Sequence, residues 1–330
     1  MKTILSHLFQ HKTFSKDEAK GILIDIASGK YNHSQIASFL TAFIMRNITL
    51  DELRGFREGL LSLCHKINLS EYKAMDVCGT GGDGKNTFNI STLTSFVLAG
   101  AGVPVSKHGN YGVSSISGSS NVLEYLGVRF QTDESKLKTQ LAQAGICFLH
   151  APLFHPAMKH VAPVRKDLGV KTFFNMLGPL VNPSQPSIQM TGVFNLELAR
   201  MYQYLFQEEN IQYCIVHAMD GFDEISLTGV CKIINNEGET IVTERDFHFD
   251  KVDYKDLHGG DTVEEAAIIF MNIINGKGTV SQNHVVVANA AMAIKTYYPD
   301  VTISQAIERA TESLLALKAK QSFTILKEIQ

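Results

Sequence analysis

The sequence lacks the features that mark secreted and membrane proteins. Its five cysteines are widely spaced among 330 residues and form no C-x-x-C pair, which favours reduced thiols over a disulfide framework or a zinc site. No stretch approaches the roughly 18 apolar residues of a membrane span. The first residues have a broken apolar stretch without a small-residue cleavage site, so we expect no signal peptide. These absences predict a soluble cytoplasmic protein without a membrane partner.

An excess of basic residues is also absent. The chain carries 30 Lys and Arg against 33 Asp and Glu, a formal net charge of −3, whereas a general nucleic-acid-binding protein is usually basic. With 45% hydrophobic and 19% charged residues, the composition is that of an ordinary globular protein. We therefore expect no nucleic-acid partner, although a local cluster of Lys and His can still bind a small anion.

The first 70 residues show only the helical period. Ser15 and Glu18 form a capping box before a helix over 19–28, and Thr49 begins another that runs through 53–66. A third helix is predicted over 34–47. We interpret residues 1–70 as a small helical domain.

From residue 71 to 330 the pattern predicts one larger domain in which strands alternate with helices. Ser91 or Thr92 is expected to cap the first helix, and Asp133 the third. Strands are predicted over 74–78, 103–107, 146–149, 187–194 and 213–218, a hairpin over 231–244, and helices over 91–102, 119–127, 134–145, 196–209, 260–276, 283–298 and 304–320. The predicted fold class is α/β, with a mostly parallel sheet flanked by helices and ligands bound at the carboxyl ends of its strands.

A glycine-rich loop directly follows the first predicted strand. Four glycines lie within residues 79–84, which leaves backbone N–H groups free to meet an anion. A dinucleotide site fails because the second strand ends at Ser106, Lys107 and His108, with no acid to hold a ribose. A P-loop fits poorly, since Asn86 stands where Ser or Thr should bind Mg²⁺ and the helix does not begin at once. The third alternative is a cradle for pyrophosphate.

A second polar loop follows the next strand. Residues 107–121 contain Lys107, five serines and three glycines, and they lead into a helix. A lysine, several hydroxyls and a helix N-terminus together suit a phosphate. Two such loops on successive strands suggest a ligand with phosphates at both ends.

Four segments, in this order, resemble the signature loops of anthranilate phosphoribosyltransferases. They are GTGGDGKNTFNIST at 79–92, KHGN at 107–110 with SGSSNVLE at 117–124, the run HPAMKHVAPVRKDLGVKTFFNMLGPLVNP at 155–183, and GFDEISLTG at 221–229. The resemblance spans nearly the whole chain. It implies a nucleoside phosphorylase/phosphoribosyltransferase-like fold and a cytoplasmic homodimer that meets through the N-terminal helices, with 155–182 packing on those helices. It implies transfer of the phosphoribosyl group of phosphoribosyl pyrophosphate (PRPP) to anthranilate in tryptophan biosynthesis.

The same resemblance implies the residues of the site. PRPP is expected at Gly79, Gly82, Asp83, Thr87, Asn89, Ile90, Ser91, Thr92, Lys107 and Ser119. Anthranilate is expected at Gly79, Asn110 and Arg165, and Mg²⁺, two ions per subunit, at Ser91, Asp223 and Glu224. Tyr111-Gly112 departs from the family, where many members have Arg and a small residue, which removes a positive charge from the second loop.

These residue types suit the chemistry. Loss of pyrophosphate from C1 of PRPP builds negative charge on the leaving group, which electrostatic preorganisation and Mg²⁺ can stabilise. Asp223 and Glu224 follow a buried strand in a loop, from which adjacent acids can both point inward. The planar fork of Arg165, on a helix predicted over 158–169, suits a carboxylate.

We expect no acid–base residue, because an aromatic amine is already unprotonated at neutral pH and needs orientation. We do not assign His108 as a base, and for His155 and His160 we expect surface or capping roles.

Three alternatives remain open at this point. A pyrimidine-nucleoside-phosphorylase-like enzyme would carry Lys-His-Ser-Thr-Gly-Gly where this chain has Cys78-Gly79-Thr80-Gly81-Gly82. A diverged family member that binds nucleic acid would need a basic surface. A P-loop NTPase would depend on Lys85.

Overall fold

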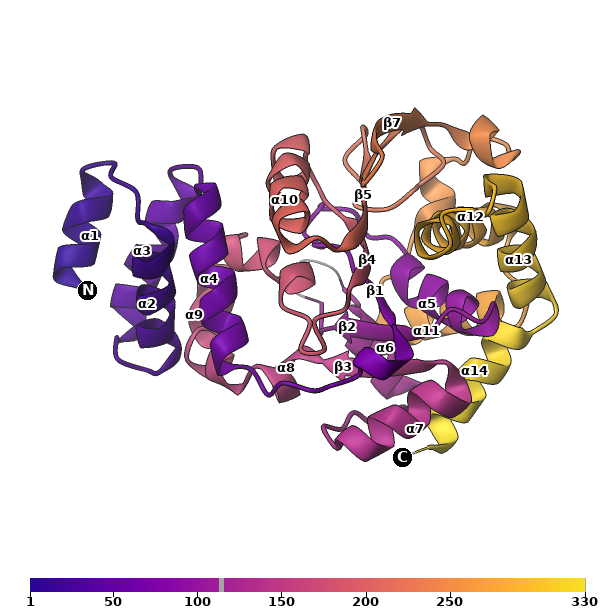
Figure 1. The fold of residues 1–330 in the computed structure, drawn as a ribbon, viewed down its shortest axis with the longest axis horizontal. Helices are drawn as coiled ribbons and strands as arrows, with labels where there is room; N and C mark the ends of the chain where they lie inside the picture. The colour runs from indigo at the N-terminus through magenta and orange to yellow at the C-terminus, as the bar shows by residue number, and fades with distance from the viewer. Residues whose placement is uncertain (113–115, 330) are drawn as a thin grey trace. The chain divides into compact units, whose positions relative to one another are not determined.

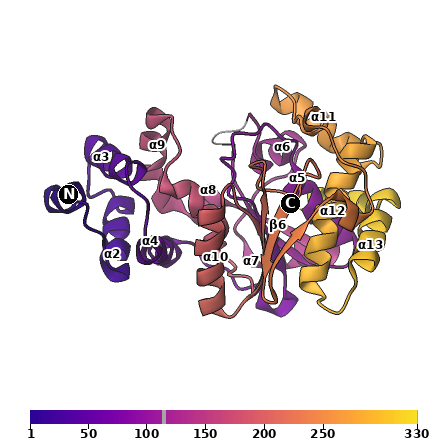
Figure 2. The same cartoon turned by 90° about the horizontal axis from the view of Figure 1, so that it is seen from above.

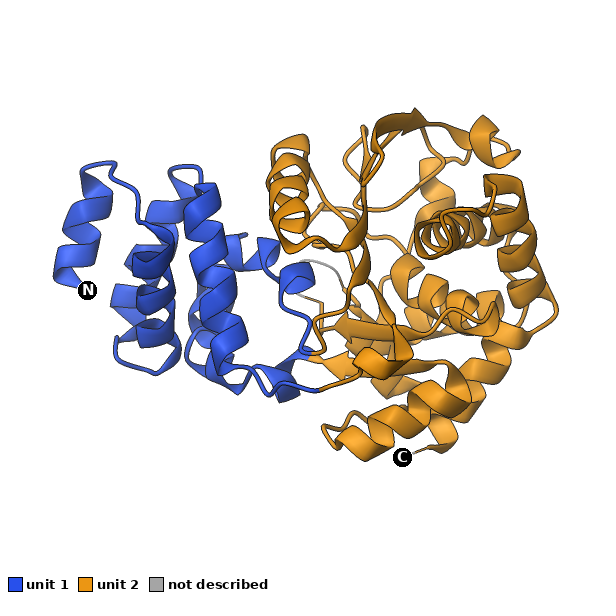
Figure 3. Ribbon diagram, in the orientation of Figure 1, with its two compact units in different colours: residues 1–67, 151–183 blue, residues 68–150, 184–330 orange. Residues whose placement is uncertain are grey.

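The computed structural model describes residues 1–112 and 116–329 (Figure 1, and turned by 90° in Figure 2). These residues divide into two compact units, one formed by 1–67 and 151–183 and the other by 68–150 and 184–330 (Figure 3). A single boundary at residues 70 and 71 therefore differs from this division, because 151–183 leaves the second segment and joins the N-terminal helices. No helix in the described part of the chain is long and apolar enough to cross a membrane.

Unit 1 is helical, and its helix starts are fixed by side chains. Ser15, Asn32 and Thr49 each form a capping box with the residue three positions on, which satisfies backbone N–H groups in the first turn. The α-helices are α1 Lys2–Phe9, α2 Lys16–Ala27, α3 His33–Ile44, α4 Leu50–Leu63, α8 Ala151–Phe154 and α9 Ala162–Leu168, with 3₁₀ turns at Pro156–His160, Phe173–Met176 and Gly178–Leu180. The helix α1 has no counterpart in the predicted elements, and the single helix expected over 158–169 is instead a 3₁₀ turn followed by α9.

The core of unit 1 explains why residues 151–183 belong to it. Phe173 stacks on Phe56 of α4 with ring centroids 4.4 Å apart, and it meets Phe39 and Phe43 of α3 edge-on. A Cβ on Gly55 would lie 2.2 Å from the carbonyl oxygen of Lys16, so this glycine lets α4 approach α2 closely. Burial of aromatic side chains from both segments thus stabilises one core.

Unit 2 is built on a seven-stranded sheet in the order β3-β2-β1-β4-β5-β6-β7, parallel except for the last two pairings. Its strands are β1 Met75–Val77, β2 Val105–Gly109, β3 Ile146–His150, β4 Ile188–Gly192, β5 Gln212–Ala218, β6 Cys231–Asn235 and β7 Gly238–Val242. The chain runs from β1 outward to β3 and returns to place β4 on the other side of β1. The switch point of this α/β sheet, where ligands bind, therefore lies between β1 and β4.

Helices cover both faces of the sheet. They are α5 Ile90–Gly100, α6 Ser119–Tyr125, α7 Glu134–Ala144, α10 Leu196–Glu209, α11 Val263–Ile274, α12 Val280–Tyr297, α13 Ile303–Leu315 and α14 Lys318–Glu328, with 3₁₀ turns at Ser70–Tyr72, Glu244–Phe247 and Tyr254–Leu257. In Figure 1, α10 lies on one side of β5 and α12 on the other, and both pack against it. Helix α12 packs against α5 as well as β4 and β5, so it reaches the core beneath the switch point.

Two predicted helices of unit 2 need correction. Helix α5 begins at Ile90 after Asn89, whose side chain does not cap it, so neither Ser91 nor Thr92 is the cap. The helix expected over 304–320 is divided into α13 and α14 at Leu317, which has a left-handed φ of 61°. The predicted cap at Asp133 is confirmed, because its carboxylate accepts the N–H groups of Ser135 and Lys136.

The histidine His155 does not have the surface role expected for it. It is 6% exposed, and its Nε2 lies 2.9 Å from the carbonyl oxygen of Val181. Burial lowers the pKa of His155 to about 4. The neutral ring is therefore part of the folded state, while His160 is partly exposed.

We predict that His155 makes unit 1 less stable in mild acid. Since its folded-state pKa is depressed below the ordinary value of about 6.5, its contribution is complete above pH 6.5 and is lost as the pH falls toward 4. Between pH 7 and pH 5 this loss amounts to about 2 kcal/mol. Urea unfolding of wild type and His155→Gln at both pH values measures it, and the variant should show a smaller difference. An equal pH dependence in both proteins contradicts the assignment.

Candidate active site

The loops that follow β1, β4 and β5 meet at the carboxyl edge of the sheet. The backbone after β1 stays paired with β4, because the N–H of Cys78 donates to Met190 (3.2 Å) and the N–H of Thr80 donates to Gly192 (2.9 Å). Asp223 and Glu224 lie in the loop after β5, with no regular secondary structure, as predicted. Their position is therefore set by the order of the parallel strands.

The glycine-rich loop and the acids touch directly. Gly81 donates its backbone N–H to Oδ2 of Asp223 at 2.7 Å. A Cβ on Gly79 would lie 2.4 Å from the same oxygen, so a larger residue cannot stand there without a shift. The three glycines Gly81, Gly82 and Gly84 have φ values of 60°, 73° and 76°, which favour glycine. The backbone of this loop therefore lies against Asp223. Glycine is required at Gly79 for space and at Gly81 for its left-handed backbone.

The end of β4 is equally constrained. A Cβ on Gly192 would lie 1.5 Å from the carbonyl oxygen of Asp223. The glycine therefore provides the space in which the backbone of the acidic loop lies. Nothing in the predicted strand pattern marked Gly192 as part of the site.

Both acids hold a proton more tightly than ordinary carboxyl groups. Burial, and after it the negative charge of Asp83, raises the pKa of Asp223 to about 7. Burial and the charge of Asp223 raise the pKa of Glu224, although the ammonium of Lys107 and a hydrogen bond from the Ser91 N–H act in the opposite direction. The site thus concentrates negative charge in a poorly solvated place, which a cation would stabilise.

Lys107 brings a positive charge to the floor of this site. It lies in β2 and is 2% exposed, and its Nζ donates to the carbonyl of Val77 at 2.6 Å. The same Nζ lies 3.4 Å from Oγ of Ser91, in the first turn of α5. Lys107 and Ser91 are therefore brought together, as the expected site requires.

The other expected PRPP residues surround the start of α5. Thr87, Asn89 and Ser91 are partly exposed, whereas Ile90 and Thr92 are each 1% exposed, so their side chains are covered. Asn89 donates from its amide to the carbonyl of Ser117 at 3.2 Å, which links α5 to the second loop.

The second loop is closed by the start of α6. Ser119 donates its hydroxyl to the carbonyl of Asn110 at 3.3 Å, and Oδ1 of Asn121 accepts the N–H groups of Gly112 (2.9 Å) and Gly118 (3.0 Å). Asn110 is exposed. Residues 113–115 of this loop lie outside the described residues.

Tyr111, which stands where many family members have Arg, is tied to α6. Its hydroxyl donates to the carboxylate of Glu124 at 3.2 and 3.3 Å, and its ring meets His150 edge-on with centroids 4.8 Å apart. His150 is buried, pairs with Ser120 at 2.8 Å, and has its pKa lowered to about 4 by burial. Tyr111 therefore fastens the second loop to Glu124 and His150 through its hydroxyl and its ring, and it brings no positive charge to the loop.

Arg165 belongs to unit 1, unlike Gly79 and Asn110. Its Nη2 donates to the amide oxygen of Asn175 at 3.3 Å, and its guanidinium carbon lies 5.4 Å from the centre of the Phe174 ring. Burial lowers its pKa to about 10, so the side chain stays charged at neutral pH. A shared anthranilate site at these three residues stays a prediction.

Lys85 does not have the surroundings of a P-loop lysine. Its Nζ lies 4.8 Å from the ring centre of Phe222 and 5.0 Å from that of Tyr254, a cation–π arrangement. Helix α5 begins only at Ile90, so Lys85 does not open a helix as a P-loop lysine does. It instead joins the glycine-rich loop to the residue next to Asp223.

The donor set suits Mg²⁺ only in combination with a substrate. In residues 1–112 and 116–329, no group of three or more His, Cys, Asp or Glu side chains is arranged to hold a metal ion. Asp223, Glu224 and the hydroxyl of Ser91 offer hard oxygen ligands, and Mg²⁺ commonly takes one or two carboxylates together with phosphate oxygens and water. The residues present fit a metal that arrives with a phosphate.

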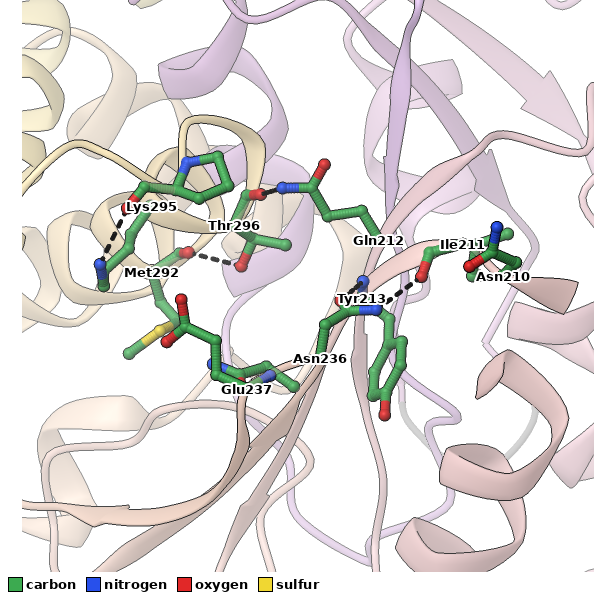
Figure 4. A pocket seen from close by; sticks show the side chains of 11 residues that line it. Asn210, Ile211, Gln212, Tyr213, Asn236, Glu237, Met292, Lys295 and Thr296 are labelled. Atoms are coloured by element: carbon green, nitrogen blue, oxygen red, sulfur yellow. Dashed lines mark hydrogen bonds between the residues drawn. The ribbon is translucent and has the colours of Figure 1, made fainter. Parts of the chain in front are cut away.

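A pocket of about 360 Å³ lies at the opposite end of β5 (Figure 4). Its polar groups already bond to the protein: Gln212 donates to the carbonyl of Thr296, and Asn236 accepts the N–H of Tyr213 at 2.8 Å. Lys295 donates to two backbone carbonyls at 3.3 Å. The pocket thus forms where the start of β5 and the β6–β7 turn lie beside α12, away from the acids.

The chain matches two family models over most of its length. Residues 71–320 match the model described as the glycosyl transferase family, a/b domain, and residues 2–64 match that family's helical bundle domain. A relative from Flavobacterium johnsoniae named anthranilate phosphoribosyltransferase is 59% identical over 100% of this chain and 99% of its own. A relative of the same name from Cytophaga hutchinsonii is 50% identical over 98% of each chain.

Solved structures agree with the fold. The anthranilate phosphoribosyltransferase of Thermus thermophilus has a TM-score of 0.90 at 28% identity, covering 99% of this chain and 98% of its own. The Saccharomyces cerevisiae enzyme, solved in complex with PRPP and Mg, has a TM-score of 0.90 at 26% identity with the same coverage. The expected helical domain and larger α/β domain are confirmed. The relatives support the transferase over the phosphorylase-like and nucleic-acid-binding alternatives.

We predict that Gly192→Ala displaces the acidic loop. Because the new Cβ would overlap the carbonyl of Asp223, the free energy of unfolding should fall by about 2 kcal/mol, and Mg²⁺-dependent binding of pyrophosphate should weaken. Urea unfolding and calorimetry measure the two effects. Gly21→Ala is the control, since a Cβ there meets nothing within 4 Å and favours its helix. Wild-type binding in Gly192→Ala would show that the loop does not need this space.

Proposed function

The chain belongs to the anthranilate phosphoribosyltransferase family, and we propose that it carries out this transfer at the carboxyl edge of its sheet, around Asp223 and Glu224. The phosphoribosyl group of PRPP passes to the amine of anthranilate, giving N-(5-phosphoribosyl)anthranilate and pyrophosphate, in tryptophan biosynthesis. The observation that carries the location is the buried Asp223, bonded to the glycine-rich loop, with the partly exposed Glu224 next to it. This arrangement suits a polyanionic substrate only together with a cation.

The bond changes are simple. The amine nitrogen donates its lone pair to C1 of the ribose, and the bond from C1 to the pyrophosphate oxygen breaks with its electron pair staying on that oxygen. The nitrogen then releases its surplus proton to water. A direct displacement of this kind inverts C1 and needs no covalent intermediate. Positioning of the two reactants then supplies much of the rate.

The glycine-rich loop and the start of α5 hold PRPP. The PRPP set comprises Gly79, Gly82, Asp83, Thr87, Asn89, Ile90, Ser91, Thr92, Lys107 and Ser119. For the covered side chains of Ile90 and Thr92, the contact is through the backbone at the helix N-terminus, which favours an anion. Lys107 contributes a positive charge beside Ser91.

Ser91, Asp223 and Glu224 hold Mg²⁺, with two ions per subunit. Bound there, Mg²⁺ supplies positive charge that stabilises the leaving pyrophosphate. The raised pKa values of the two acids support this assignment, because a nearby cation offsets the burial of their negative charge. A titration that saturates at one ion per chain with PRPP present would reject the count of two.

Arg165 binds the carboxylate of anthranilate, together with Gly79 and Asn110. A guanidinium that stays charged at neutral pH and presents a planar fork supports this role. No residue acts as an acid or base, because the aromatic amine is already unprotonated. Unchanged KM for anthranilate in Arg165→Gln would reject the contact.

The protein is a cytoplasmic homodimer that meets through unit 1. Five large apolar side chains of this unit are exposed, among them Phe9 at 65%, Ile44 at 44% and Met45 at 81%, which supports an interaction surface there. All five cysteines are free thiols, which favours a reducing compartment. Sedimentation as a 36.4 kDa species at micromolar concentration would reject the dimer.

We predict that the chain consumes anthranilate only when PRPP and Mg²⁺ are both present. The loss of anthranilate fluorescence measures the rate. In a double variant, Asp223→Asn with Glu224→Gln, the rate should fall by about 100-fold or more, because the leaving group loses its electrostatic support.

The matched control removes the same two charges from exposed positions, Asp300→Asn with Glu308→Gln, and should keep the wild-type rate. A folded wild-type protein that consumes no anthranilate contradicts the proposed acceptor. A double variant at Asp223 and Glu224 that is as active as the control contradicts the location of the site.

A further inference from the structure

The backbone that follows the two acids is held by a side chain from a distant helix. Asn289 lies in the middle of α12 and is 0% exposed. Its Nδ2 donates to the carbonyl of Ile225 at 2.9 Å, and its Oδ1 accepts the N–H of Ile225 at 3.0 Å. A third bond, from Nδ2 to the carbonyl of Val285 at 2.9 Å, fixes the amide to its own helix. The side chain is therefore bonded on both sides to the residue after Glu224.

The chemistry of these bonds selects asparagine. Ile225 presents one backbone donor and one acceptor, and a primary amide of this length meets both. Leucine has nearly the same shape and offers neither group, while aspartate keeps the acceptor and loses the donor. The flanking residues of α12 are buried valines and alanines, so the amide has been placed in apolar surroundings where its desolvation must be offset by hydrogen bonds.

Other anchors of the acidic loop act at other places. Gly79 and Gly192 limit the space beside Asp223. Ala218 donates its N–H to the carbonyl of Phe222 at 3.0 Å, which closes the turn before the acids. Asn289 acts on the far side of Glu224, and the Ile225 side chain is itself buried. The backbone is thus held on both sides of the acids, by the turn before Asp223 and by Asn289 of α12 after Glu224.

We propose that Asn289 is a positioning residue for the metal-binding acids, holding Glu224 and Asp223 at the separation that a metal and a phosphate need. The proposal rests on the proposed function, since it assigns a purpose to the geometry of the same acids. Asn289 acts through Ile225. Partners of this kind, which orient metal ligands, typically change metal affinity or activity by about 10- to 100-fold when they are replaced.

The test compares two variants with a matched control. Asn289→Leu removes all three bonds at nearly constant shape, and Asn289→Asp keeps only the acceptor for Ile225. Ser313→Ala is the control, because Ser313 is 1% exposed, donates to the carbonyl of Val97 at 2.7 Å, and lies on α13. Each variant loses buried hydrogen bonds within unit 2, but only those at Asn289 reach the acidic loop.

Binding of Mn²⁺ in the presence of saturating pyrophosphate is measured by the paramagnetic relaxation of water protons. This titration separates the affinity of folded molecules from the number of sites, so partial unfolding lowers the second value only. Asn289→Leu should weaken Mn²⁺ by about 10- to 100-fold, and Asn289→Asp by less. The half-saturating Mg²⁺ concentration of the reaction should rise in parallel, whereas Ser313→Ala should leave both within about twofold of wild type.

Wild-type Mn²⁺ affinity in the folded fraction of either Asn289 variant overturns the proposal. If Asn289→Leu yields no folded protein, Asn289→Asp decides the question. The double variant of Asp223 and Glu224 is titrated beside them. Wild-type affinity in that double variant rejects the proposed metal site itself, whereas lost affinity there with wild-type affinity in the Asn289 variants rejects only the positioning role.

Discussion

The geometry of unit 2 around its glycine-rich loop depends on two adjacent carboxyl groups with limited access to water, the buried Asp223 and the partly exposed Glu224. Burying ionised carboxyl groups is costly unless they are paired or hydrogen-bonded. Gly81 and Ser91 each supply a backbone N–H, and Lys107 supplies a nearby charge. These partners do not cancel the penalty, since the pKa of both acids remains raised. The remaining excess of negative charge supports the proposal that a cation binds beside these acids.

The surrounding geometry follows from this demand. The strand order places β1 between β2 and β4, so that the loops after β1, β4 and β5 come together. Gly79 and Gly192 leave room for Asp223, and Lys85 lies over Phe222 and fastens the glycine-rich loop to the acidic loop. In the proposed site, a phosphate would meet backbone N–H groups, the N-terminus of α5 and the buried Lys107. The same contacts would therefore position both the proposed anion site and the proposed cation site.

Local patterns in the sequence predicted much of this architecture. Caps at Ser15, Thr49 and Asp133, the alternation of strands and helices, and the glycine-rich loop all depend on residues close together in the chain. The break between α13 and α14 was not predicted, because the residue with the left-handed backbone there is Leu317 and not the Gly or Asn that usually marks such a position. The start of α5 was placed late, because Asn89 offers no capping hydrogen bond and the hydroxyl residues lie inside the helix.

Local patterns could not predict contacts between residues that are far apart in the sequence. Asn289 lies in a run of valine and alanine that reads as a plain buried helix, and its partner Ile225 is 64 residues away. The stacking of Phe173 on Phe56, which places 151–183 in unit 1, likewise joins distant segments. The metal-binding roles of Asp223 and Glu224 came from the family resemblance, since a lone Asp-Glu pair in a loop is usually a solvated turn. The roles assigned to individual residues stay predictions.

Under the proposed function, this site binds a phosphate tightly only when a cation is bound with it. Calorimetric titration of the wild-type protein with pyrophosphate, once with Mg²⁺ and once with a chelator, tests it most directly. Repulsion from Asp223 and Glu224 should weaken binding by roughly 100-fold when Mg²⁺ is removed. Equal affinity under both conditions would contradict the account, because the backbone N–H groups and Lys107 would then suffice to hold the anion.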